Sequence, residues 1–117
     1  MYKRKSDLKQ AINENMRGGA GSVIITHLAD AAEMYNNSRL FANLTIKPGC
    51  SIGHHVHEGE TEFFYVMSGS ALYDDNGTEV ELSQGDVTVT PSGHGHSIYN
   101  NGDTDLELIA LITREQY

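Results

Sequence analysis

One pattern recurs from residue 38 onward: a short run of alternating apolar and polar residues, followed by a turn signal. In residues 39–47, RLFANLTIK, every second residue from Leu40 to Ile46 is apolar, and side chains of a strand alternate between two faces. Turn signals such as DDNG separate the runs. We expect further strands at residues 61–69, 70–75, 78–86, 86–91, 96–102 and 105–113. This succession predicts an all-β sandwich or barrel.

The N-terminal third predicts less regular structure. Ser6 or Asp7 is a suitable cap for a short helix, which would end at Gly18. The following residues predict one strand and then one or two helical turns, at 21–28 and 29–37.

The length of the chain, 117 residues, is that of one domain. Such a chain buries roughly two thirds of its unfolded surface, which is enough for one core. We therefore expect residues 1–37 to form an N-terminal segment of the same domain, whose barrel spans residues 38–117.

The charge of the chain argues against two classes of partner. The formal net charge is -8 and no basic stripe offsets it, so a nucleic-acid backbone would be repelled. No apolar run approaches the roughly 20 residues that a membrane span needs. The basic N-terminus leads into no apolar core, and the chain has one cysteine, so we expect a cytoplasmic protein without an internal disulfide.

Histidines cluster in two short segments. Five of the six lie there, at His54, His55, His57, His94 and His96. Residues i and i+2 of a strand share a face, so His55 and His57 would direct their imidazoles to one point. His54 and Val56 would face away.

Two further side chains would complete a metal site. Glu62 opens the next strand and would reach the same point from an antiparallel neighbour, and His96 would add a third imidazole. Three neutral imidazoles and one carboxylate suit a divalent transition metal. Manganese, iron, nickel, cobalt, copper and zinc all accept such ligands. The set leaves coordination positions open for water or a substrate.

The spacing of these residues resembles the two motifs of the cupin superfamily. The fixed positions of the first motif are Gly49, His55, His57, Glu62 and Gly69. Those of the second motif are Gly85, Pro91, Gly93, His96 and Asn100. The resemblance implies a small single-domain bacterial cupin, which is a double-stranded antiparallel β-helix or jelly roll, here with a short N-terminal helical segment. It also implies the metal ligands: His55, His57, Glu62 and His96.

Inward positions near the expected metal give candidates for a substrate pocket. They are Phe64, Tyr73, Asn43 and Arg39, with His94 at the pocket mouth. Phe64 equally suits plain core packing, and Arg39 equally suits a solvated strand end. Glu58 and Glu60 are expected to face water, with support of a ligand as the alternative role of one of them.

Strand 61–69 also suggests an assembly. If Glu62, Phe64 and Val66 face inward, the three large apolar residues Phe63, Tyr65 and Met67 face outward and need a cover. The N-terminal strand of the same chain or of a partner would supply it. Because small cupins often dimerise through edge strands, the resemblance implies a homodimer.

Two functions remain open at this point. The first is a metal-dependent enzyme acting on a small oxygen-rich substrate such as an organic acid, a sugar or an enol, as a decarboxylase, dioxygenase or isomerase. The alternative is a non-catalytic module that binds a carboxylate or sugar through its metal. No acid or base stands out beside the ligands, and a pocket without one would favour binding.

Overall fold

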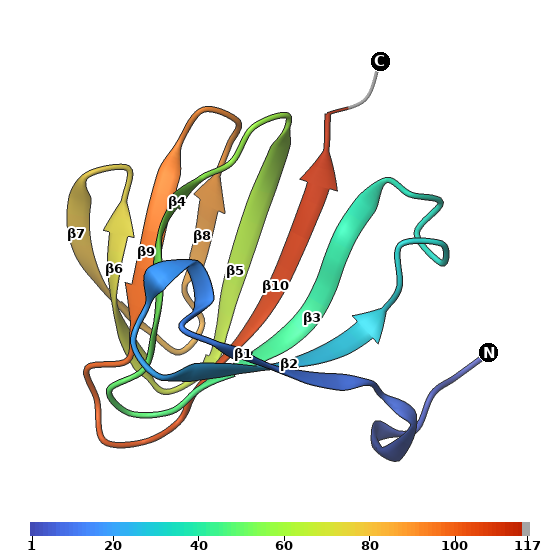
Figure 1. The fold of residues 1–117 in the computed structure, drawn as a ribbon, viewed down its shortest axis with the longest axis horizontal. Helices are drawn as coiled ribbons and strands as arrows, with labels where there is room; N and C mark the ends of the chain where they lie inside the picture. The colour runs from blue at the N-terminus through green and yellow to red at the C-terminus, as the bar shows by residue number, and fades with distance from the viewer. Residues whose placement is uncertain (116–117) are drawn as a thin grey trace.

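A computed structural model describes residues 1–115 and shows two facing antiparallel sheets (Figure 1). The larger sheet has the strand order β1-β2-β3-β10-β5-β8, and the smaller has the order β4-β9-β6-β7. The strands are β1 (Gln10–Glu14), β2 (Ser22–Ala29), β3 (Ser38–Ile46), β4 (Ser51–Val56), β5 (Glu60–Ser68), β6 (Ser70–Asp75), β7 (Thr78–Ser83), β8 (Val87–Thr90), β9 (Gly95–Tyr99) and β10 (Leu106–Arg114). This arrangement confirms the predicted all-β double-stranded fold.

The core lies between the inner faces of the two sheets. On β3 and β10, alternate residues from Ala42 to Ile46 and from Leu106 to Ile112 are buried, as the two-residue period requires. Ile98 and Tyr73 of the smaller sheet pack against them. Burial of each large apolar side chain contributes about 1.5–3 kcal/mol, so this alternation accounts for much of the stability of the barrel.

Helical structure in the N-terminal segment is limited to two single 3-10 turns, η1 (Lys5–Asp7) and η2 (Met16–Gly18). The predicted continuous helix from Ser6 to Gly18 is wrong in extent, because the residues between the turns form β1 and pair with β2. All five residues of β1 are exposed, so strand pairing rather than burial stabilises it. Of residues 29–37, where one or two helical turns were expected, residues 31–36 form hydrogen-bonded turns, and the strand predicted at 21–28 is β2.

Asn100 and Gly69 hold the turns that connect the sheets. The buried Asn100 amide donates to the carbonyl oxygens of Ile46 and Thr104, both at 2.8 Å. Gly69 has φ +86°, and a Cβ there would lie 2.6 Å from the carbonyl oxygen of Asp105. Only glycine accepts both constraints, so the chain can pass from β5 into β6 of the other sheet at this point.

The outer face of β5 is partly uncovered. Tyr65 and Met67 are 44% and 45% exposed, while Glu62, Phe64 and Val66 are buried, as the alternation predicts. The N-terminal strand that we expected at residues 21–28 is β2, which lies in the same sheet as β5 beyond β3 and β10, so the expected cover by this strand of the same chain is wrong. In the described part of the chain, no helix combines the length and the hydropathy that a membrane crossing requires.

Candidate metal centre

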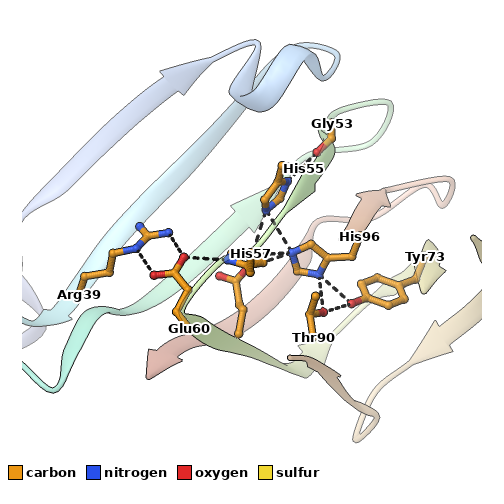
Figure 2. A network of polar contacts seen from close by, with 9 residues as sticks. Arg39, Gly53, His55, His57, Glu60, Tyr73, Thr90 and His96 are labelled. Carbon is orange, nitrogen blue, oxygen red and sulfur yellow. Dashed lines mark hydrogen bonds and ion pairs between the residues drawn. The ribbon is translucent and has the colours of Figure 1, made fainter. Parts of the chain in front are cut away.

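Four side chains from both sheets meet inside the barrel, and Figure 2 shows three of them, His55, His57 and His96, directed towards one another. His55 on β4 is paired with His96 on β9, and His57 follows the end of β4. Glu62 lies on β5, which belongs to the other sheet. We had expected Glu62 to reach the cluster from a neighbouring strand, but it reaches the cluster across the barrel. One ligand atom from each residue lies within 4.8 Å of all the others.

The facing atoms are the Nε2 nitrogens and one carboxylate oxygen. Glu62 Oε1 lies 3.0 Å from Nε2 of His57 and 3.0 Å from Nε2 of His96. The His96 Nε2 atom is 3.1 Å from Nε2 of both His57 and His55. Donor atoms of three imidazoles and a carboxylate are thus directed to one small volume.

Two of the imidazoles are oriented by acceptors on their other ring nitrogen. His55 Nδ1 lies 2.8 Å from the carbonyl oxygen of Gly53, and His57 Nδ1 lies 2.9 Å from Glu60 Oε1. A carbonyl or carboxylate oxygen only accepts, so each Nδ1 carries the proton. In the neutral rings the Nε2 lone pairs then face the cluster, which is the tautomer that metal binding requires.

The third imidazole is held from inside the barrel. His96 Nδ1 lies 2.7 Å from Tyr73 Oη and 2.9 Å from Thr90 Oγ1. Both hydroxyl oxygens can accept the Nδ1 proton. Tyr73 and Thr90 also bond each other at 2.9 Å, and all three residues are buried. Packing therefore fixes the orientation of His96 before any ion arrives.

The environment keeps Glu62 ionised although it is only 5% exposed. Burial opposes the charge, but the three imidazoles, with Nε2 of His57 and His96 at 3.0 Å and that of His55 at 3.9 Å, outweigh this cost when they carry a proton on Nε2, and they hold the pKa of the carboxyl well below its usual range. A buried carboxylate among imidazoles is an arrangement that a cation stabilises further.

The pKa values of two imidazoles shift in opposite directions. The hydrogen bond to Glu62 raises the pKa of His57, against the opposing effect of burial, and Glu60 adds to the rise. Burial lowers the pKa of His96, although Glu62 opposes the shift. A proton and a metal ion would compete for the His57 Nε2 atom, so metal affinity should depend on pH.

These four residues could hold a divalent metal ion, because the donor set consists of three nitrogens and one oxygen with matching tautomers. Such an ion would act as a Lewis acid towards an oxygen ligand. The nature of the donors does not select one metal.

A cavity of about 50 Å³ adjoins the cluster. Its lining includes three of the ligand residues, His55, His57 and Glu62, and the two arginines Arg17 and Arg39. The rest of the lining is apolar: Met16, Leu40, Leu44, Ile52, Phe64 and Ile112. The cavity thus presents the metal ligands, cationic side chains and an apolar wall to one small guest.

Arg39 is tied to the cluster through Glu60. Its Nε and one Nη atom donate to the two Glu60 oxygens, each at 2.7 Å, and Glu60 Oε1 also accepts from His57. Figure 2 shows this chain from Arg39 to His57. The bonds from Arg39, aided by His57 and opposed by burial, lower the pKa of Glu60 to about 2. Glu60 is therefore the loop carboxylate that supports a ligand, whereas Glu58 is exposed.

The expected pocket residues on the inner face lie on two sides of His96. Phe64 lines the cavity and stacks on the His96 ring, with a centroid distance of 5.1 Å and an interplanar angle of 17°. Tyr73 lies behind His96 and does not line the cavity. Its hydroxyl orients a ligand and is not presented to a guest molecule.

Asn43 and His94 lie away from the cavity. Asn43 lies on β3 between the buried Ala42 and Leu44, so its side chain points to the opposite, outer face of the sheet. There it donates to Glu107 Oε2 at 2.7 Å. The prediction that Asn43 points inward is therefore wrong. The His94 side chain is exposed, and its backbone carbonyl accepts from the amide of His57.

The residues that sequence reasoning missed come from η2. Met16 and Arg17 line the cavity, although no feature of the sequence assigned either residue to a pocket. The contact between η2 and β4 joins segments more than 30 residues apart, and no motif spacing indicates it.

A larger hollow of about 300 Å³ lies between residues 3–9 and residues 27–33 of the N-terminal segment. The Lys3 ammonium there is 2.6 Å from the Glu33 carboxylate, so its main charges neutralise each other. None of the four clustered residues lines this hollow. The smaller cavity is therefore the candidate binding site.

Comparison with known proteins gives concordant matches. The family model described as "Cupin domain" matches residues 42–112. The oxalate-binding protein of Thermotoga maritima is 46% identical over 112 residues, which cover 96% of this chain and 93% of that protein. A T. maritima crystal structure described as a predicted oxalate decarboxylase has a TM-score of 0.93 and 45% identity, and the match covers 97% of this chain and 99% of that one.

A more distant relative is the tetracenomycin polyketide synthase protein TcmJ of Streptomyces glaucescens. It is 25% identical over 97 residues, which cover 83% of this chain and 62% of that protein. The family match spans most of the barrel and includes every residue of the metal cluster. With its two-sheet fold and these relatives, the chain belongs to the cupin domain family.

Proposed function

We propose that this protein binds a small carboxylate through one divalent metal ion held by His55, His57, Glu62 and His96. The observation that carries the proposal is the composition of the cavity beside the cluster. It combines metal ligands with two arginines and an apolar wall. A carboxylate would bind the ion through its oxygens, and the guanidinium groups suit carboxylates in geometry and charge.

The cavity favours binding over turnover. Among the described residues that line it, the ligands and the two arginines are the only ionisable groups. Glu60, the nearest additional carboxylate, is bound on both oxygens by Arg39 and on one by His57. A general acid or base must reach the reacting atoms, and no lining group is placed for that task.

Oxalate is the first ligand to test. It is the molecule named for the relative that is 46% identical, and a small dianion suits a cavity of about 50 Å³. Manganese is the first metal to test, followed by iron, nickel and zinc, because all accept nitrogen and oxygen ligands.

A metal-dependent enzyme is the second candidate function. It is favoured by the T. maritima structure, which is described as a predicted oxalate decarboxylase and is 45% identical. In such an enzyme the ion would polarise the bound carboxylate, and the apolar wall with Phe64 and Leu44 would exclude water from it.

One experiment separates these functions. Purified protein loaded with manganese is titrated with oxalate by calorimetry, and the same mixture is assayed for carbon dioxide and formate. Binding with oxalate recovered unchanged supports the binder. Formation of formate would show that the protein is a decarboxylase and not a binding protein. The absence of oxalate binding with manganese, iron, nickel and zinc alike would refute both functions.

We further propose a homodimer that covers the outer face of the larger sheet. Tyr65, Met67, Val87 and Val89 are exposed together on the neighbouring strands β5 and β8, and an apolar face of this kind marks an interface. Light scattering after size exclusion should give twice the chain mass, and Val89→Glu should give one chain mass. A monomeric wild type would contradict the proposal. A cytoplasmic location stays a prediction from the sequence.

A further inference from the structure

The turn η2 has an unusual backbone. Asn15 and Arg17 have φ values of 51° and 55°, and the intervening Met16 packs against the core. Left-handed backbone is unfavourable for residues other than glycine and persists where surrounding structure enforces it. Two such residues within one turn indicate that the position of this turn matters.

Close packing on β4 holds the turn in place. A Cβ on Gly53 would overlap the carbonyl oxygen of Arg17, and a Cβ on Gly19 would overlap that of Ser51. Ser51 also binds Ala20 twice, through its Oγ at 2.8 Å and its amide at 2.9 Å. The backbone of η2 is therefore fixed against the strand that carries His55.

One glycine positions both the turn and a metal ligand. The carbonyl oxygen of Gly53 accepts from His55 Nδ1 at 2.8 Å, while the missing Cβ of Gly53 leaves room for the backbone carbonyl of Arg17. Arg17 lines the cavity that His55 also lines. The chain thus brings this arginine and the metal centre together through a single packed unit.

Arg17 is the cation of this cavity that has no anionic partner. Arg39 is neutralised by Glu60, with both bonds at 2.7 Å. Within residues 1–115, no carboxylate lies within ion-pair distance of Arg17. With a divalent ion on Glu62, the groups around the cavity would carry two positive charges in excess, one from the ion and one from Arg17.

We propose that Arg17 determines specificity for a small dicarboxylate by pairing with the carboxylate oxygens that the metal leaves free. The inference rests on the proposed function, since it requires a carboxylate on the ion. Two excess positive charges match a dianion, whereas a monocarboxylate would leave Arg17 unpaired. Arginine also offers the planar pair of donors that a carboxylate accepts.

The test compares two probes on manganese-loaded protein by calorimetry: oxalate, with two carboxylates, and acetate, with one. Arg17→Gln should weaken oxalate binding about tenfold, the effect of losing one charged hydrogen-bonded pair, and should leave acetate binding within about twofold. Arg17→Lys should recover part of the loss, because it restores the charge but not the fork of donors. Manganese content should stay at the wild-type level.

Lys47→Gln is the matched control, because it removes one positive charge at an exposed position outside the cavity, and it should leave both affinities unchanged. An Arg17→Gln variant that binds oxalate like the wild type would overturn the role of Arg17 and leave the proposed function intact. Equal weakening of oxalate and acetate would likewise overturn specificity. A wild type that binds neither probe would refute the proposed function and this inference with it.

Discussion

The candidate metal centre is supported differently on its two sides. On the inner side, His96 is oriented by the neutral hydroxyls of Tyr73 and Thr90, and all three residues are about 1% exposed. On the outer side, His57 is oriented by the ion pair of Glu60 and Arg39, whose guanidinium side chain is 39% exposed. Both arrangements hold a proton on Nδ1 of the histidine. The inner one does so with buried, tightly packed neutral groups, and the outer one does so with a charged pair.

This difference separates two requirements of the site. A buried neutral partner is fixed by its neighbours and is insensitive to salt and pH. A partly exposed charged partner responds to both, and also to anions that approach Arg39. The inner side therefore keeps the orientation of His96 constant, while the orientation of His57 on the outer side should respond to pH and salt.

The largest effect should come from removing a ligand on either side. His96→Ala and His57→Ala should each lower manganese content from about one ion per chain to less than about a tenth, because each removes one of four donors. Elemental analysis of dialysed protein measures this. Glu62→Ala should act in the same way.

His94→Ala is the control for these ligand variants, since His94 is an exposed histidine two residues before a ligand. Retention of metal by both histidine variants would show that the cluster is not the binding site.

The next largest effect should separate the two sides in stability. Phe64→Ala on the inner side removes the ring that stacks on His96 and leaves a cavity, so the free energy of unfolding should fall by about 3–5 kcal/mol. The exposed Val80→Ala should change it by less than about 0.5 kcal/mol. Urea unfolding of the metal-free protein measures both. A small loss for Phe64→Ala would mean that the inner side is not fixed by packing.

A smaller effect should follow from the hydroxyl on the inner side. Tyr73→Phe removes the partner at 2.7 Å from His96 Nδ1 but leaves Thr90 at 2.9 Å. Metal affinity should fall about tenfold, as for other partners of metal ligands. Competition with a chelating dye measures the affinity. Leu82→Ile is the control, because it is a buried change in the smaller sheet away from the cluster, and it should leave metal affinity unchanged. Equal metal affinities of Tyr73→Phe and the wild type would show that the Tyr73 hydroxyl does not support the metal ligand.

The sequence predicted those parts of the fold that follow from local periodicity. The alternation from Leu40 to Ile46 indicated the buried face of β3, and the same rule directed His55 and His57 to one side. It did not predict β1, because residues 10–14 form a strand only through pairing with β2. That pairing depends on a distant segment and has no pattern of its own, since all five residues are exposed.

The site shows the same limit. Motif spacing indicated the four ligands, but the sheet to which Glu62 belongs depends on the turn at Gly59, after which the chain enters the other sheet. Arg17 reaches the cavity through the packing of η2 on Gly53, a contact that spacing does not encode. Residues placed by alternation were therefore predictable, whereas residues placed by long-range packing were not.

The smallest effect should appear on the outer side and should depend on pH. Arg39 lowers the pKa of Glu60 to about 2, with His57 assisting and burial opposing, whereas an unfolded glutamate titrates near about 4.3. A lowered carboxyl pKa stabilises the fold above the unfolded value, and this contribution disappears as the pH falls towards about 2. Glu60→Gln should therefore reduce the free energy of unfolding at pH 7 but not near pH 2.

The expected difference at pH 7 is about 0.5–1 kcal/mol, because Arg39 is partly exposed and solvent screens the pair. Urea unfolding of metal-free protein at several pH values between about 2 and 7 measures it, and the comparison with wild type removes the similar contribution of Glu62. Glu58→Gln, at an exposed position two residues before Glu60, should show no such dependence. Because Tyr73 carries no charge in this range, Tyr73→Phe should shift stability equally at every pH. If Glu60→Gln also shifted it equally at every pH, the two sides of the centre would be supported in the same way.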